Sequence, residues 1–152
     1  MRLRDVLAGK SNEVRTIPSH ATCDDVVSEL VRHNIGSLIV RDEPGGPILG
    51  IITERDILKA HAANRVSLAQ LSVAKFMSSA LVTATPEDDI TVAMRLMTTH
   101  RIRHLPVLEG GQLFGLLSIG DVVKAQHDEL VMENHHMLAY IQGGGSVATP
   151  LM

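Results

Sequence analysis

The pattern of apolar and polar positions occurs twice along the chain. The segment from Thr16 to Val40 aligns without gaps with the segment from Thr83 to Val107. In both segments apolar residues recur at i, i+3, i+4 and i+7, which predicts an amphipathic helix with one buried face. These positions are Cys23, Val26, Val27 and Leu30 in the first segment and Ile90, Ala93, Met94 and Met97 in the second. A duplicated unit therefore organises the chain.

Two short apolar runs follow each predicted helix, and a turn that contains glycine separates them. The runs are 37–40 and 48–53 in the first copy, and 104–108 and 113–118 in the second. Glycine supplies the positive backbone angles that a reversal between strands needs. A second helix follows directly, so each copy is predicted to have the order β-α-β-β-α.

This order predicts a mixed fold of helices and strands, α/β in the broad sense and α+β in the narrower one, built from two repeats. A three-stranded sheet with two helices on one face leaves its other face apolar, so the two copies should pack on one another as a pseudo-twofold pair. The predicted division is repeat 1 over 1–66, repeat 2 over 67–128, a C-terminal helix extension over 129–142 and a flexible tail over 143–152.

The predicted helix starts differ between the repeats. Thr85 followed by Pro86 is typical of an N-cap and a first helical position. Thr22 with Asp25 resembles a capping box, which would start the first helix later and make it shorter.

The last helix has an unusual length. The helical pattern that begins at Ile119 continues to Gln142, before Gly143. At about 1.5 Å per residue it would form a rod of roughly 36 Å, too long for one repeat to cover. We expect it to project and to meet another subunit.

Composition excludes several classes of function. The net charge of -3 and the 2% aromatic content argue against nucleic-acid binding, because neither a positive field nor stacking platforms are present. No apolar run approaches the roughly 20 residues of a membrane span, which predicts a soluble, cytoplasmic protein. Cys23 is the single cysteine, so an internal disulfide and a multi-thiolate zinc site are both excluded. No metal is expected.

Each repeat places a hydroxyl residue at the end of its last strand and a carboxylate three positions later. The two pairs are Thr53 with Asp56 and Ser118 with Asp121. A carboxylate can accept both hydroxyls of a ribose cis-diol, and the neighbouring Arg55 and the helix N-terminus favour phosphate. The same spacing also suits a plain helix cap, which remains an alternative for both pairs.

The densest basic cluster lies at the start of the run 104–108 in the second repeat. It comprises Arg101, Arg103 and His104, of which Arg103 and His104 are predicted to face an anion. The corresponding positions of repeat 1 are uncharged, so the two candidate sites are not equivalent. No catalytic triad and no phosphate-binding glycine loop is evident.

The runs GIITERDI (50–57), GLLSIGDV (115–122) and RIRHLPV (101–107) resemble the cystathionine beta-synthase (CBS) domain family, over roughly 5–126. The resemblance implies a CBS pair, or Bateman module, with two sheets face to face and two clefts between them. It is similar to short bacterial signal-transduction proteins that form dimers of such pairs. One departure is the segment 9–13, which has no counterpart after Met77 and bears on the shape of the first adenine pocket.

In that family the clefts bind adenosyl ligands such as AMP, ADP, ATP, NAD or S-adenosylmethionine. The resemblance implies that Asp56 and Asp121 hold ribose hydroxyls and that Thr53 and Ser118 contact ribose or phosphate. The residues implied to border the adenine are Thr16, Thr83 and Ala84, with Ile35 and Ile102 packing against it. Those implied to meet phosphate are Arg55, Arg103 and His104.

The resulting hypothesis is a non-catalytic regulatory module that binds an adenine nucleotide, AMP or NAD before the others, and signals to an unidentified partner. Its homodimer would form through the helices of the pair and the C-terminal helix. Two alternatives remain: a structural dimerisation module without ligand, and a nucleotide-hydrolysing enzyme that uses the acidic helix starts.

Overall fold

The computed structural model describes residues 1–10 and 13–142. Repeat 1 contains β1 (Thr16–Ile17), α2 (Cys23–His33), β2 (Ser37–Val40), β3 (Gly50–Thr53) and α3 (Glu54–Ala63). Its sheet has the order β1-β2-β3, with β1 parallel to β2 and β3 antiparallel to it. The predicted β-α-β-β-α order of repeat 1 is confirmed.

Repeat 2 pairs its two hairpin strands as repeat 1 does, but its first strand is reduced to a single β-bridge. It contains α5 (Ile90–His100), β4 (His104–Glu109), β5 (Gln112–Ser118) and α6 (Ile119–Gln142). Ala84 bridges Val107 in parallel, as Ile17 pairs with Val40 in repeat 1. The predicted first strand of repeat 2 is therefore one residue long.

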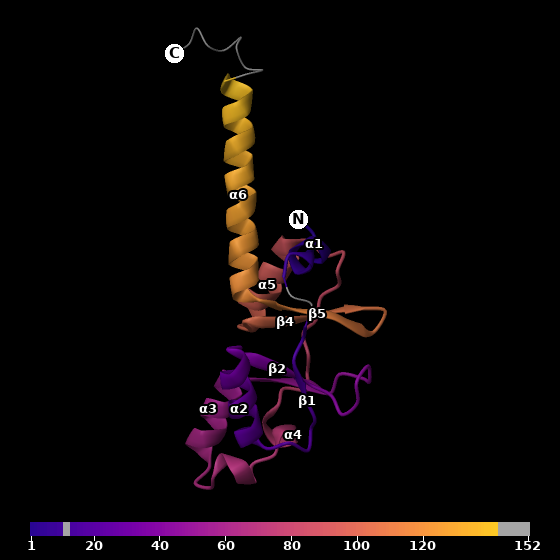
Figure 1. Cartoon of the computed structure of the whole chain (residues 1–152), viewed down its shortest axis with the longest axis vertical. Coiled ribbons are helices and arrows are strands. Elements are labelled where there is room, and N and C mark those ends of the chain that lie inside the picture. The colour runs from indigo at the N-terminus through magenta and orange to yellow at the C-terminus, as the bar shows by residue number, and fades with distance from the viewer. Residues whose placement is uncertain (11–12, 143–152) are drawn as a thin grey trace.

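The two repeats stack along the long axis of the molecule (Figure 1). The sheets lie next to each other at the middle, while α2 and α3 lie on the outer side of one sheet and α5 and α6 on the outer side of the other. This arrangement matches the predicted face-to-face pair, with Phe114 and Leu116 of β5 half-buried along the cavity between the repeats.

The helix starts correct two expectations. Thr22 caps α2 in a capping box with Asp25, as predicted, but α5 is capped by Asp89 and not by Thr85. Both helices have 11 residues, so the expectation of a shorter first helix is wrong. Helix α5 starts after Pro86 because Pro86 lies in a turn that is bound to another part of the chain. The carbonyl oxygen of Pro86 accepts a hydrogen bond from Arg4 N at 2.9 Å.

Each repeat receives a short helix from outside its own predicted range. Helix α1 (Leu3–Ala8) packs in repeat 2, where Leu3 and Leu7 join the core around α5. Helix α4 (Val73–Phe76), after the short 3-10 helix η1 (Leu68–Gln70), packs in repeat 1. The N-terminal segments of the repeats are thus exchanged across the predicted division at 66 and 67.

Backbone hydrogen bonds show that this exchange is symmetric. Leu3 N donates to Asp88 O at 2.9 Å, and Val73 N donates to Ala21 O at 2.9 Å. Asp88 and Ala21 occupy the same position of the repeat. Two further pairs of bonds repeat in the same way, namely Arg4 N to Pro86 O with Ala74 N to Ser19 O, and Ile90 N to Met1 O with Cys23 N to Leu71 O.

The first turns of helix α6 pack on repeat 2, and the rest of the helix projects away from both repeats (Figure 1). Val122 and Ala125 are its buried residues, and every residue from Leu130 to Gln142 is exposed. The predicted long helix is confirmed, and the predicted tail 143–152 lies outside the described residues. Within the described chain, no helix combines the length and apolarity that a membrane span requires.

Candidate functional site

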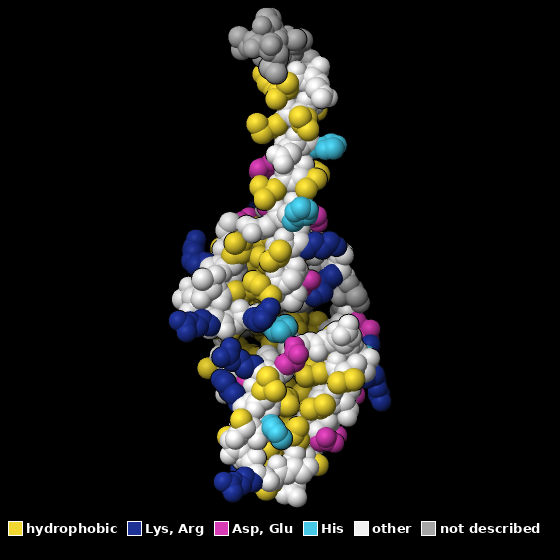
Figure 2. Space-filling view, turned by 90° about the vertical axis from the view of Figure 1, so that its left-hand side faces the viewer, with side chains coloured by type: hydrophobic (Ala, Val, Ile, Leu, Met, Phe, Trp, Pro, Cys, Tyr) yellow, Lys and Arg dark blue, Asp and Glu magenta, His cyan; other side chains and the backbone are white. Residues whose placement is uncertain are grey.

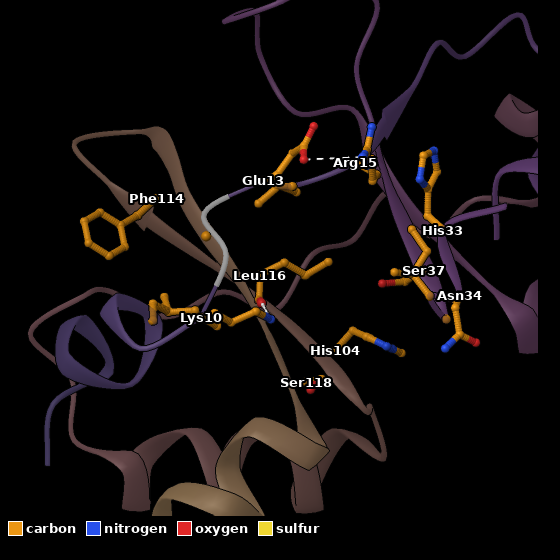
Figure 3. Close-up of a pocket in the computed structure, with 15 residues that line it drawn as sticks. Lys10, Glu13, Arg15, His33, Asn34, Ser37, His104, Phe114, Leu116 and Ser118 are labelled. Carbon is orange, nitrogen blue, oxygen red and sulfur yellow. Dashed lines mark hydrogen bonds and ion pairs between the residues drawn. The ribbon is translucent and has the colours of Figure 1, made fainter. Parts of the chain in front are cut away.

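A cavity of about 510 Å³ lies between the two repeats (Figure 3). Its wall combines the segment after α1, the end of α2 with the start of β2, and the strands β4 and β5. The charged and polar lining residues are Lys10, Glu13, Arg15, His33, Asn34, Ser37, His104 and Ser118, and the apolar ones include Leu7, Val14, Ile35, Phe114 and Leu116.

Of the predicted pair, Ser118 lines this cavity, whereas Asp121 lines a second cavity of about 170 Å³ that shares Lys10 with the first. Ser118 N donates to Asp121 Oδ2 at 2.8 Å, and Asp121 N donates to Ser118 Oγ at 3.1 Å. The pair therefore closes the first turn of α6 reciprocally, which is the local geometry of a capping box. The same Asp121 oxygen also accepts a hydrogen bond from Lys10 Nζ at 2.8 Å.

Opposing effects set the pKa of Asp121. Burial acts to raise it, but hydrogen bonds from Lys10 and Ser118 outweigh burial and hold the pKa below its ordinary value. Asp121 is consequently an anion at neutral pH, as a group that accepts ribose hydroxyls must be.

The equivalent pair of repeat 1 has the same capping geometry. Thr53 N donates to Asp56 Oδ2 at 2.9 Å, and Asp56 N donates to Thr53 Oγ1 at 3.4 Å. The structure therefore builds both predicted pairs and gives each the capping role that the sequence left open. Capping uses one oxygen of each carboxylate and leaves the other oxygen for further contacts.

His104 of repeat 2 faces Gly36 of repeat 1. A Cβ atom at Gly36 would lie 3.3 Å from His104 Nε2 and 2.6 Å from Glu54 Oε1. Burial lowers the pKa of His104, while Glu54 acts to raise it. Because Arg103 occupies the position in repeat 2 that Gly36 has in repeat 1, the two sides of the interface differ in charge, as predicted.

The other predicted site residues are not brought together around this cavity. Ile35, His104 and Ser118 line it, whereas Ala84 is buried in the core of repeat 2 and Ile102 packs against that core. Two further groups are not part of the cavity lining. The half-buried ones are Thr53, Asp56 and Asp121, and the exposed ones are Thr16, Arg55, Thr83 and Arg103.

Sequence reasoning missed the residues that the segment before β1 contributes. Lys10, Glu13 and Arg15 line the cavity, and Arg15 pairs with Glu13 at 3.3 Å. The signal for them was the segment 9–13, which has no counterpart in repeat 2. Figure 2 shows Lys and Arg side chains gathered at the waist of the molecule, where its surface is hollowed.

The family model of the CBS domain matches this chain twice, over residues 3–63 and 73–128. The chain belongs to the CBS-domain family. The two matches correspond to the two repeats seen in the fold, so the chain carries a CBS pair, which is a regulatory module.

Among curated proteins, the CBS pair is similar to the mitochondrial CBS domain-containing protein CBSX3 of Arabidopsis thaliana, with 42% identity over 127 residues. That match covers 81% of this chain and 61% of CBSX3, so the chain spans less than two thirds of this relative. Among solved structures, the CBS-domain containing protein ATU1752 from Agrobacterium tumefaciens has 37% identity and a TM-score of 0.79, covering 83% of this chain and 99% of that chain.

Two further CBS structures bear on ligands and assembly. The CBS pair of protein MJ0100 was solved in complex with 5'-methylthioadenosine and S-adenosyl-L-methionine, with a TM-score of 0.72, 25% identity and coverage of 82% of this chain and 98% of that chain. A CBS-CP12 protein from bloom-forming cyanobacteria is hexameric, with a TM-score of 0.70, 26% identity and coverage of 96% and 86%.

Proposed function

We propose that the protein is a non-catalytic sensor that binds an adenine nucleotide, AMP or NAD, between its CBS repeats and signals occupancy to a partner protein. One observation carries the proposal: a hydroxyl residue and an ionised carboxylate, Ser118 and Asp121, form a reciprocal pair, and Ser118 lines a cavity between the repeats. The adenosyl ligands of the MJ0100 CBS pair support the same ligand class.

Ribose recognition would use the carboxylates at the starts of α3 and α6. A cis-diol donates two hydrogen bonds, and a charge-assisted hydrogen bond contributes roughly 1.5–3 kcal/mol. Asp121 would accept the diol in the cleft of repeat 2 and Asp56 in that of repeat 1. Ser118 and Thr53 would add contacts to ribose or phosphate.

Adenine and phosphate would occupy the parts of each cleft that the two repeats share. Ile35, which lines the cavity, offers an apolar surface to a base, and His104 lies on the same cavity where it can meet an anion. We assign the remaining contacts by position in the repeat: Thr16, Thr83, Ala84 and Ile102 to the adenine, and Arg55 and Arg103 to phosphate.

Isothermal titration tests this proposal. The purified protein is unfolded and refolded to remove any ligand from the expression host, and is then titrated separately with AMP, ATP, NAD and S-adenosylmethionine. A micromolar dissociation constant for AMP or NAD is the expected result. Silence for all four ligands would contradict the sensor and favour the structural alternative.

One observation favours a role in dimerisation alongside sensing. Beyond residue 129, α6 exposes apolar side chains that no other described part of the chain covers, namely Leu130, Val131, Met137, Leu138 and Ile141. Residues along one face of α6 are separated alternately by three and four positions, which is the heptad spacing of a coiled-coil seam. In chain order they are His127, Leu130, Asn134, Met137 and Ile141. We propose that a second copy of the chain covers this seam, with further contacts through the helices of the CBS pair.

The acidic helix starts do not support the hydrolase alternative. Asp25 accepts from Thr22 N at 2.9 Å and Asp88 accepts from Thr85 N at 2.8 Å, so both carboxylates stabilise local turns. Asp89 caps α5. We therefore propose no enzymatic activity.

A further inference from the structure

Lys10 forms an ion pair with Asp121, the carboxylate that we assign to ribose. Lys10 Nζ lies 2.8 Å from Asp121 Oδ2 and 3.0 Å from the carbonyl oxygen of Leu116. The side chains of this ion pair are 38% and 24% exposed, so the pair is partly shielded from water. Figure 3 shows the Lys10 side chain running along the cavity wall toward Leu116.

This arrangement exists in one cleft and not in the other. Among the residues that the structure describes, Asp56 forms no ion pair, although its capping geometry matches that of Asp121. Lys10 belongs to the segment 9–13, which repeat 2 lacks. The ammonium group is therefore a feature of the cleft of repeat 2 alone.

The ion pair changes what a ligand must offer in order to bind. Asp121 Oδ2 already accepts the Ser118 amide and the Lys10 ammonium, so a ribose diol that uses both carboxylate oxygens has to displace the ammonium. A partly buried ammonium that loses its partner is destabilised unless it finds another anion. Adenosine brings no anion, whereas a nucleotide brings its phosphate.

We propose that Lys10 is a specificity-determining residue that makes the cleft of repeat 2 select phosphorylated adenosyl ligands over neutral adenosine. When the ribose takes Asp121, the ammonium moves to the phosphate of the same ligand. The flexible four-carbon side chain of lysine allows this exchange without movement of the backbone. This inference rests on the proposed binding of an adenine nucleotide.

Titration with AMP and adenosine, on the refolded wild type and on Lys10→Met, tests the exchange. Methionine keeps most of the apolar side chain and removes the charge. The wild type should bind AMP at least tenfold more tightly than adenosine. In Lys10→Met, adenosine should bind at least threefold more tightly and AMP at least threefold more weakly, so that the preference falls about tenfold.

Two further variants separate this role from a general effect of charge or folding. Lys10→Arg keeps a cation that pairs with carboxylate and phosphate, and it should retain the AMP preference. Lys59→Met removes an exposed lysine of α3 in repeat 1 and should behave as the wild type. Urea unfolding of each variant verifies that it is folded.

The possible outcomes are distinct. If the wild type binds AMP and Lys10→Met keeps the same preference within twofold, the role of Lys10 is wrong while the proposed function stands. If Lys10→Met binds adenosine where the wild type does not, the inference is supported. If neither probe binds either protein, the inference is overturned, and the four-ligand panel decides separately on the proposed function.

Discussion

Asn34 and Arg101 adopt the same left-handed backbone conformation at the C-caps of equivalent helices. Asn34 follows α2 with φ 51° and ψ 53°, and Arg101 follows α5 with φ 54° and ψ 44°. Asparagine tolerates this conformation, whereas arginine adopts it at a cost because of its Cβ atom. The duplication therefore preserved the backbone while the side chain diverged.

Replacing Arg101 by glycine should stabilise the protein. Glycine removes the steric cost of the left-handed conformation, and we expect the free energy of unfolding to rise by about 0.5–1 kcal/mol. Urea denaturation measures the change. The matched variant Asn34→Gly should gain less, because asparagine already tolerates the conformation. A loss of stability in Arg101→Gly would show that the side chain makes a stabilising contact.

Removing the Asp121 carboxylate should weaken both binding and folding. Asp121→Ala loses the bond from Ser118 N and should destabilise the protein by about 1 kcal/mol. It should also weaken AMP binding by roughly tenfold or more, measured by isothermal titration. Asp121→Asn keeps a carbonyl acceptor for Ser118 and loses the charge, so it should restore stability more than affinity. Unchanged affinity in both Asp121→Ala and Asp56→Ala would refute the ribose assignment.

Alanine at Gly50 should be more damaging than alanine at Gly115. A Cβ atom at Gly50 would lie 2.7 Å from the Ser78 carbonyl oxygen, which is backbone and cannot turn away. At Gly115 the nearest atom is Leu7 Cδ1 at 3.0 Å, on a side chain that can adjust. We expect a loss of about 1–3 kcal/mol for Gly50→Ala and a smaller loss for Gly115→Ala in urea unfolding. Equal losses would mean that the α4 segment moves as easily as Leu7.

Acidification should destabilise the protein through His104. Burial lowers its pKa in the folded state, so the unfolded chain binds the proton more readily and stability falls as pH falls below about 6.5. The contribution of neutral His104 is fully present above that pH. We expect the wild type to lose more stability than His104→Gln between pH 7.5 and 5.5, measured by urea unfolding. Parallel losses in the two proteins would argue against this role for His104.

Charges placed on the seam of α6 should abolish self-association. Leu130 and Met137 are 59% and 63% exposed, so Leu130→Glu with Met137→Glu should leave the monomer fold intact. Multi-angle light scattering should report a dimer or larger assembly for the wild type and a monomer for the variant. His135→Glu, off the heptad seam, is the control and should assemble as the wild type does. Association that survives the double substitution would move the interface to the helices of the CBS pair.

Most of the fold was predictable because the repeat carries its own pattern. The apolar spacing from Cys23 to Leu30 and from Ile90 to Met97 placed α2 and α5, and the limits of β2 agree with the predicted run 37–40. The start of α5 was not predictable from Thr85 and Pro86. Its position depends on the backbone of Arg4, which is distant in sequence and bonds to the Pro86 carbonyl.

The site was only partly predictable for the same reason. Ser118 and Asp121 are close in sequence, so their spacing identified them. Lys10 reaches Asp121 because α1 packs in the core of the other repeat, and no local pattern shows where a six-residue helix will dock. Contacts between distant segments require the fold itself.

The exchange of the short helices α1 and α4 also affects the order in which the protein can fold during synthesis. Leu3 and Leu7 are synthesised before repeat 1, but Leu117 and Val122, which share their core, follow only after the whole of repeat 1. The nascent α1 therefore has to wait, with its apolar face uncovered, until most of the chain has been synthesised. A chain cut between α3 and α4 would yield two fragments, each missing the short helix that completes its core.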